Sequence, residues 1–155
     1  MDELNKQQPI ENTPDDHIKA VEQSLANDRA EWSKKIKTII GMLRGVSELS
    51  ECQVMMLSYR QMLVDKLSEF KSKIYKKNST VDKIFKQRYI EYTTQYNLKL
   101  SSVEKAQFIK ADMDDIRLQI QMLQGHVDFY MECIKTLDNM AFAIRNRIKL
   151  NEDDM

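Results

Sequence analysis

The chain has 155 residues, of which 42% are hydrophobic and 31% charged, and its 24 Lys and Arg residues balance its 24 Asp and Glu residues. This composition is too apolar and too evenly charged for a chain that is disordered throughout. Only 3 Gly and 2 Pro are present, which argues against a sheet protein with many tight turns and favours an all-α fold of long helices.

The first 13 residues are polar and lack an apolar period, which predicts a disordered arm. Apolar residues at helical spacing then predict a hairpin-like pair of helices within residues 14–78. We expect the first helix to end near Gly41 to Gly45 and the second to open at Ser47.

A basic and aromatic segment is predicted at residues 79–100. The polar run at 76–80 predicts a helix break, with Ser79 or Thr80 as the N-cap of the next helix. We expect that helix to reach about Tyr92 and to be followed by a loop, although residues 88–94 also have the composition of a strand.

Positive charge is concentrated in residues 71–88, which hold seven Lys or Arg and one acid, a balance of +6. Aromatic residues lie within and directly after this run. Cations interleaved with rings are what sequence-tolerant binding of single-stranded nucleic acid needs, whereas the alternative interpretation is a solvated helix face. The candidate nucleic-acid-binding residues are Lys73, Lys76, Lys77, Lys83, Lys86, Arg88, Tyr89 and Tyr92.

Residues 101–150 are predicted to form one long helix, which begins with a capping box at Ser101 and Glu104 and precedes an acidic tail at 151–155. Apolar residues follow a strict seven-residue repeat, which is typical of a helix packed against a partner helix. We call these positions the heptad stripe: Ile109, Met113, Ile116, Ile120, Leu123, Val127, Tyr130, Ile134, Leu137, Ala141, Ile144 and Ile148.

The heptad stripe can be covered by the chain's own first helices or by other subunits. The apolar surface widens between Phe129 and Phe142, which favours other subunits and hence a homo-oligomer. The predicted oligomerisation residues are Ile116, Ile120, Leu123, Val127, Tyr130, Ile134, Leu137, Phe142, Ile144 and Ile148.

The sequence offers no candidate for catalysis or cofactor binding. Cys52 and Cys133 each stand alone, which predicts buried thiols, and His17 and His126 lack a carboxylate or cysteine at metal-ligand spacing. No phosphate-binding glycine loop or nucleophile motif is present. We therefore expect no enzyme activity, no metal and no cofactor.

Neither a secretory signal nor an apolar run of about 18 residues is present, which predicts a soluble cytoplasmic protein with no membrane partner.

Four motifs within residues 80–150 point to a family. They are Lys86-Gln87-Arg88-Tyr89, the stretch from Ser101 to Asp115, Val127-Asp128-Phe129, and Phe142-Ala143-Ile144. Their order and spacing resemble the phage recombination mediator family typified by UvsY.

The resemblance implies a homo-oligomeric ring of six or seven subunits in the host cytoplasm. Such a ring binds single-stranded DNA and loads the phage recombinase onto DNA coated by the phage single-strand-binding protein, without catalysing a reaction. The resemblance ties Lys86 and Arg88 to DNA and the C-terminal helix to assembly. The alternative is a helical coiled-coil adaptor whose basic segment binds an acidic protein or a membrane surface.

Overall fold

The computed structural model describes residues 14–45, 48–95 and 99–153, and this part of the chain contains helices and short connections only. The helices are α1 (Pro14–Met42), α2 (Leu49–Thr94), α3 (Ser102–Asp112) and α4 (Asp114–Asp153). The expected all-α fold is confirmed. The predicted disordered arm at 1–13 lies outside the described residues.

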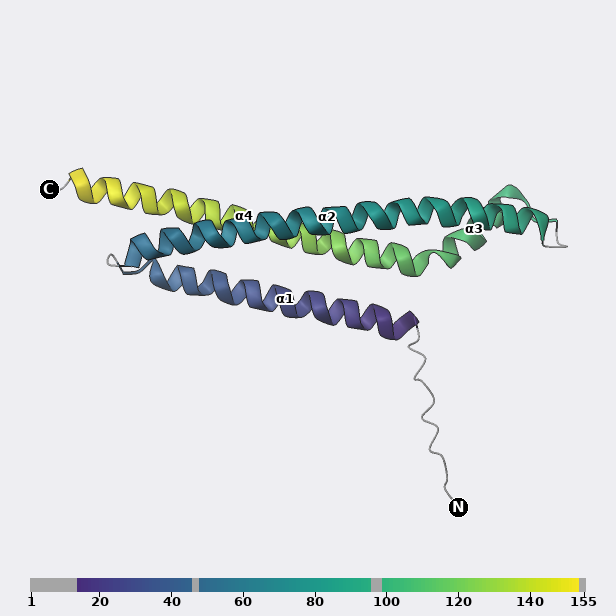
Figure 1. Ribbon diagram of the computed structural model, residues 1–155, viewed down its shortest axis with the longest axis horizontal. Helices are drawn as coiled ribbons and strands as arrows, with labels where there is room; N and C mark the ends of the chain where they lie inside the picture. Colours follow the sequence, from purple (N-terminus) through teal and green to yellow (C-terminus); the bar gives the residue numbers. More distant parts are fainter. Residues whose placement is uncertain (1–13, 46–47, 96–98, 154–155) are drawn as a thin grey trace, which may run out of the picture.

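The helices form an elongated rod (Figure 1). α2 has 46 residues, so it is about 69 Å long, and α1 and α4 both run antiparallel to it. α1 lies beside the N-terminal half of α2, and α3 lies beside its C-terminal end (Figure 1). The three long helices share one core, made of Trp32, Ile39, Leu49, Cys52, Met56, Leu63, Tyr130, Cys133, Leu137 and Ile144.

The connection between α1 and α2 falls where glycine predicts it. α1 ends at Met42, between Gly41 and Gly45, as expected. α2 begins at Leu49, and the predicted cap Ser47 lies outside the described residues. Cys52 and Cys133 are buried free thiols, which confirms the expectation for both.

The predicted helix break at residues 76–80 is wrong, because α2 passes through this run without interruption. Asn78, Ser79 and Thr80 are exposed, and the Thr80 hydroxyl donates a hydrogen bond to the carbonyl of Lys76 at 3.0 Å. Such residues each cost a helix only about 0.5 kcal/mol. Packing of the half-buried side chains before and after the run outweighs that cost, so the expected boundary at 78/79 lies inside one helix.

The predicted single helix over 101–150 is also corrected, since it is divided at Met113. The capping box at Ser101 and Glu104 is confirmed and starts α3. Met113 leaves helical geometry, with φ −109° and ψ 2°, yet its side chain is fully buried. Asp114 and Asp115 then form the first turn of α4, where carboxylates interact favourably with the helix dipole.

Every position of the heptad stripe is buried or half-buried in the single chain. Among the predicted oligomerisation residues, Leu123, Val127, Tyr130, Leu137 and Ile144 are buried, whereas Ile116, Ile120, Ile134 and Ile148 are half-buried and Phe142 is 60% exposed. The chain's own α1 and α2 supply the core around the buried positions. Other subunits can therefore reach only the half-buried and exposed positions without opening the protomer, and assembly stays a prediction.

None of the described helices is apolar enough over a sufficient length to cross a membrane.

Candidate nucleic-acid interface

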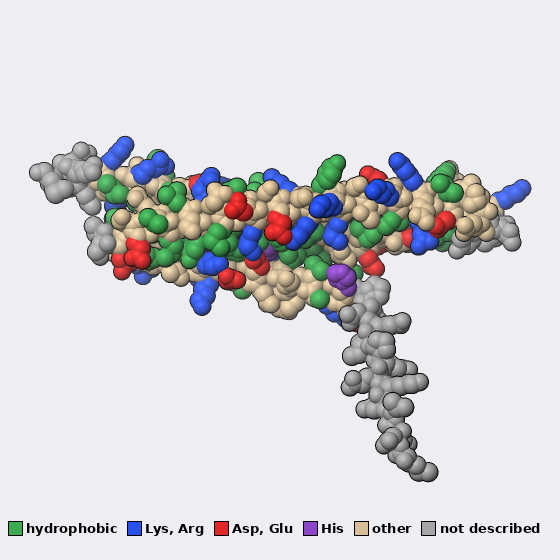
Figure 2. Space-filling view, viewed as in Figure 1, with side chains coloured by type: hydrophobic (Ala, Val, Ile, Leu, Met, Phe, Trp, Pro, Cys, Tyr) green, Lys and Arg blue, Asp and Glu red, His purple; other side chains and the backbone are tan. Residues whose placement is uncertain are grey.

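The C-terminal half of α2 carries all eight candidate nucleic-acid-binding residues. Lys73, Lys76, Lys83 and Lys86 are exposed. Lys73 forms an ion pair with Glu69 at 2.5 Å, whereas the other three lysines have no ion pair within the described part of the chain. Figure 2 shows Lys and Arg side chains standing out along the rod with apolar side chains between them.

Two exposed rings stack beside these lysines. The centroids of Phe85 and Tyr89 are 6.4 Å apart, and their planes meet at 20°. The two side chains are 38% and 41% exposed, and the ammonium of Lys105 lies 5.8 Å from the Tyr89 ring. Lys86 lies three residues before Tyr89, a spacing that places this lysine beside the Tyr89 ring on the surface of α2.

Arg88 and Tyr92 face α3 instead. The Arg88 guanidinium forms ion pairs with Glu91 at 2.9 Å and with Asp112 at 3.7 Å. The Tyr92 hydroxyl donates a hydrogen bond to Asp112 at 3.0 Å, and its ring stacks on Phe108 with centroids 6.0 Å apart. Both residues therefore connect α2 to α3. The carboxylates of Glu91 and Asp112 already neutralise the charge of Arg88, which leaves less of it for a bound anion.

Lys77 differs from the other candidate lysines because it is half-buried between α2 and α4. Its ammonium donates a hydrogen bond to the side-chain carbonyl of Gln119 at 2.7 Å. It lies on the side of α2 that faces a groove shared with α1 and α4.

Comparison with known proteins gives one result. No protein-family model, curated protein or solved structure matches the chain.

Lys105 and Phe85 are not among the eight candidate residues, although Phe85 is an aromatic residue that the sequence places within the basic run. Lys105 belongs to α3, sixteen residues after Tyr89 in the sequence, so no local spacing connects the two. Phe85 does lie four residues before Tyr89, a spacing that places both rings on one helix face. That spacing was the available signal for the stacked pair.

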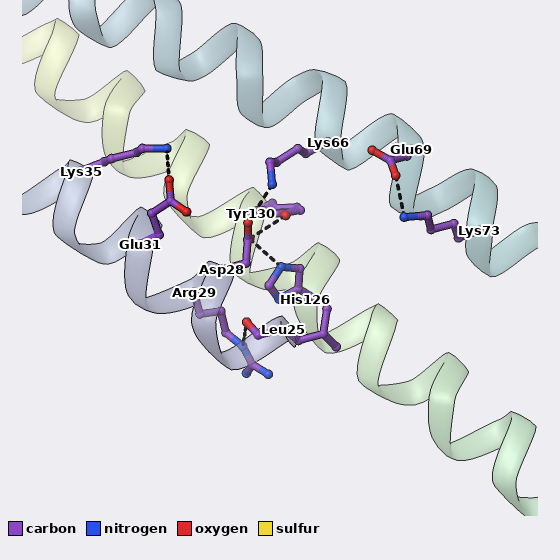
Figure 3. Close-up of polar contacts among 10 residues, drawn as sticks. All are labelled: Leu25, Asp28, Arg29, Glu31, Lys35, Lys66, Glu69, Lys73, His126 and Tyr130. Carbon is purple, nitrogen blue, oxygen red and sulfur yellow. Dashed lines mark hydrogen bonds and ion pairs between the residues drawn. The ribbon is translucent and has the colours of Figure 1, made fainter. Parts of the chain in front are cut away.

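A partly buried polar cluster lies elsewhere in the rod, where α1, α2 and α4 meet (Figure 3). The Asp28 carboxylate accepts hydrogen bonds from the Tyr130 hydroxyl at 2.8 Å, from His126 Nε2 at 2.9 Å and from the Lys66 ammonium at 2.7 Å. The Phe70 ring packs on both His126 and Tyr130, with centroid distances of 5.0 and 5.4 Å. Sequence analysis missed this cluster, which joins all three long helices.

The environment of the cluster shifts the pKa values of its members. Burial would raise the pKa of Asp28, but hydrogen bonds from Lys66, Tyr130 and His126 outweigh burial and lower it. Burial lowers the pKa of His126 below its usual 6.5, against the opposing effect of Asp28. His126 Nδ1 is buried with no hydrogen-bond partner among the described residues. His126 is therefore neutral at pH 7 and donates from Nε2.

We expect the protein to lose stability as the pH falls below about 6.5. The unfolded chain then binds a proton at His126 that the folded chain rejects, so acid favours unfolding. A further loss follows below about pH 3.8, where the lowered pKa of Asp28 acts in the same direction. Urea unfolding at pH 7.5, 6.5 and 5.5 measures the first effect.

Two variants control this measurement. His126→Gln keeps a side-chain N–H donor near Asp28 but does not titrate, so its urea midpoint should change less between pH 7.5 and 5.5. His17→Gln alters an exposed histidine and should leave the wild-type dependence intact. Equal pH dependence in the wild type and His126→Gln would contradict the assignment to His126.

Proposed function

We propose that this protein is a single-stranded-DNA-binding recombination mediator. In this proposal it assembles as a homo-oligomeric ring of six or seven subunits and helps load a strand-exchange recombinase onto DNA coated by single-strand-binding protein. It catalyses no reaction itself. The ring and the loading role rest on the resemblance to the UvsY-type family, whereas DNA binding also has support from the geometry of α2.

The observation that carries the proposal is the stacked Phe85 and Tyr89 pair, with exposed Lys86 three residues before Tyr89 and exposed Lys83 on the same helix. Lysines bind the phosphates of a strand, and exposed rings stack on its bases, whatever their sequence. A duplex keeps its bases stacked inside and offers nothing to the rings. The arrangement therefore favours single strands.

Assembly in this proposal uses a surface formed by α2 and α4. We call it the outer face and define it by three exposed residues, Leu57, Met131 and Phe142. A groove of about 370 Å³ adjoins it, and no α1 residue lines this groove. Because the buried positions of the heptad stripe pack within the chain, the outer face is an apolar surface that another subunit can reach.

Replacing Lys83 and Lys86 together with alanine tests DNA binding. We expect the affinity for a dT oligonucleotide to fall at least tenfold. The slope of log affinity against log salt should become shallower by about 1.4, because each lost phosphate contact removes about 0.7. Fluorescence anisotropy at several salt concentrations measures both quantities.

The matched control replaces Lys34 and Lys37 with alanine, two exposed lysines of α1. This variant loses the same formal charge far from the stacked rings, so it should keep the wild-type salt slope. If both double variants weaken binding equally, the effect is one of net charge, and the proposed interface is wrong.

The second candidate function is a helical adaptor whose basic segment binds an acidic protein. The observation that favours it is the 68% exposure of Val54, an apolar residue of α2 that is not part of the outer face. Retention on immobilised oligo-dT but not on duplex DNA, lost on raising the salt concentration, supports the mediator. Absence of retention on either favours the adaptor.

A further inference from the structure

A groove opens where the first turns of α1 meet α2 and α4. Its volume is about 440 Å³, and its lining includes the apolar side chains of Val21, Leu25 and Leu123 together with Lys73 and Lys77. A groove lined by apolar side chains and two cations suits a ligand that has a flat apolar part and an anionic part. A nucleotide has both.

Lys77 is the cation best placed to bind the anionic part. It is half-buried, and its described partner is the neutral amide of Gln119 at 2.7 Å. No carboxylate within the described part of the chain forms an ion pair with it. A partly desolvated ammonium without an anionic partner gains more from a phosphate than an ammonium in open water does.

One row of side chains winds around α2 from the groove to Tyr89. Lys77, Thr80, Lys83, Lys86 and Tyr89 follow each other at intervals of three residues in α2. Residues at this interval form an oblique ridge on a helix surface. The ridge advances about 18 Å along the axis between its first and last members. It also turns by about 240° around the axis, so that Lys86 lies on the side of α2 opposite Lys77, and a strand that follows the ridge winds around the helix.

We infer that this groove is a subsite for one nucleotide of a bound single strand. Lys77 binds its phosphate, and the apolar side chains of the groove hold its base or sugar. The remainder of the strand follows the ridge past Lys83 and Lys86 to the ring of Tyr89. The inference rests on the proposed function. It adds to that function a path for the strand along α2 and a groove between α1, α2 and α4 that binds one of its nucleotides.

The dinucleotide pTpT, added to the full-length protein, tests the subsite. We expect it to shift the methyl NMR signals of Val21, Leu25 and Leu123, and we expect the shifts to disappear in Lys77→Met. Lys37→Met, which alters an exposed lysine of α1, is the matched control and should keep them. For a dT oligonucleotide, Lys77→Met should weaken binding about 5- to 10-fold and make the salt slope shallower by about 0.7.

A second variant occupies the groove without removing a charge. Ala20 is an exposed residue of α1 that lines the groove, so Ala20→Trp fills the space at little cost to folding. It should weaken oligonucleotide binding and abolish the pTpT-induced shifts of the methyl signals. Unchanged oligonucleotide affinity in both Ala20→Trp and Lys77→Met would overturn the subsite.

The outcomes separate this inference from the proposed function. If pTpT leaves the three methyl signals unmoved while oligonucleotide binding still depends on Lys83 and Lys86, the subsite is wrong and the proposed function stands. If the oligonucleotide does not bind at all, both are wrong. If a short-chain phosphatidic acid moves the signals and pTpT does not, the groove takes a lipid and the nucleotide subsite is overturned.

Discussion

Replacing Asp28 with alanine is expected to lower the free energy of unfolding by about 2–3 kcal/mol. The carboxylate accepts hydrogen bonds from Lys66, His126 and Tyr130, and two of these donors are fully buried. Its removal leaves a buried hydroxyl and a buried ring N–H without an acceptor. Lys66 is partly exposed, so water solvates its ammonium once the ion pair with Asp28 is lost. The expected destabilisation is therefore smaller than for the loss of a fully buried ion pair. Urea unfolding at pH 7.5 measures the change.

Glu31→Ala is the matched control, since it removes another carboxylate from α1. Glu31 is exposed and pairs with Lys35 one helical turn away, an interaction that contributes less than about 0.5 kcal/mol. A loss in Asp28→Ala no greater than that in Glu31→Ala would show that the polar cluster does not hold the three helices together.

Replacing Met131 and Phe142 together with aspartate is expected to convert the proposed oligomer into single chains. The two side chains are 50% and 60% exposed, so the change should cost the protomer little stability. Charges buried between subunits without partners strongly disfavour association. Oligonucleotide affinity should fall at least tenfold, because the ring's many binding sites no longer act at high effective concentration. Native mass spectrometry gives the mass, and anisotropy gives the affinity.

Leu118→Asp is the control for this variant, because Leu118 is an exposed apolar residue of α4 away from the outer face. It should keep the native mass. Leu137→Asp would not serve, since Leu137 is buried in the protomer's own core and its replacement unfolds the chain. Retention of the full oligomer by the double variant would rule out the outer face, and a wild-type protein that is a single chain would rule out the ring.

The sequence predicted a helix end correctly where one short motif determines it. Ser101 and Glu104 form the capping box that their spacing indicates, and the glycines at 41 and 45 flank the end of α1. The helix break predicted at 76–80 is wrong because no single motif decides whether a helix ends there. Asn78, Ser79 and Thr80 are poor helix formers, but their small cost is outweighed by the tertiary contacts that α2 makes before and after them.

Contacts between distant residues could not be predicted from the sequence. Asp28 and His126 are 98 residues apart, and neither has a partner at helical spacing that signals the bond between them. Arg88 likewise fits a binding face when α2 is considered alone, and only the position of α3 shows that Asp112 offsets its charge. In each case the missing information is which helices are neighbours, and the periodic pattern alone does not contain it.

The thickness of the molecule changes along its length. α1 begins beside Phe70 and Lys77, so the stretch of α2 beyond them has α3 and α4 as its described neighbours and lacks a third long helix. A thinner section buries less apolar surface per turn and opens locally at lower free energy than the rest. We expect amide hydrogens near Tyr89 to exchange with solvent sooner than those near Leu63, leaving one end of the rod adaptable while the other stays rigid.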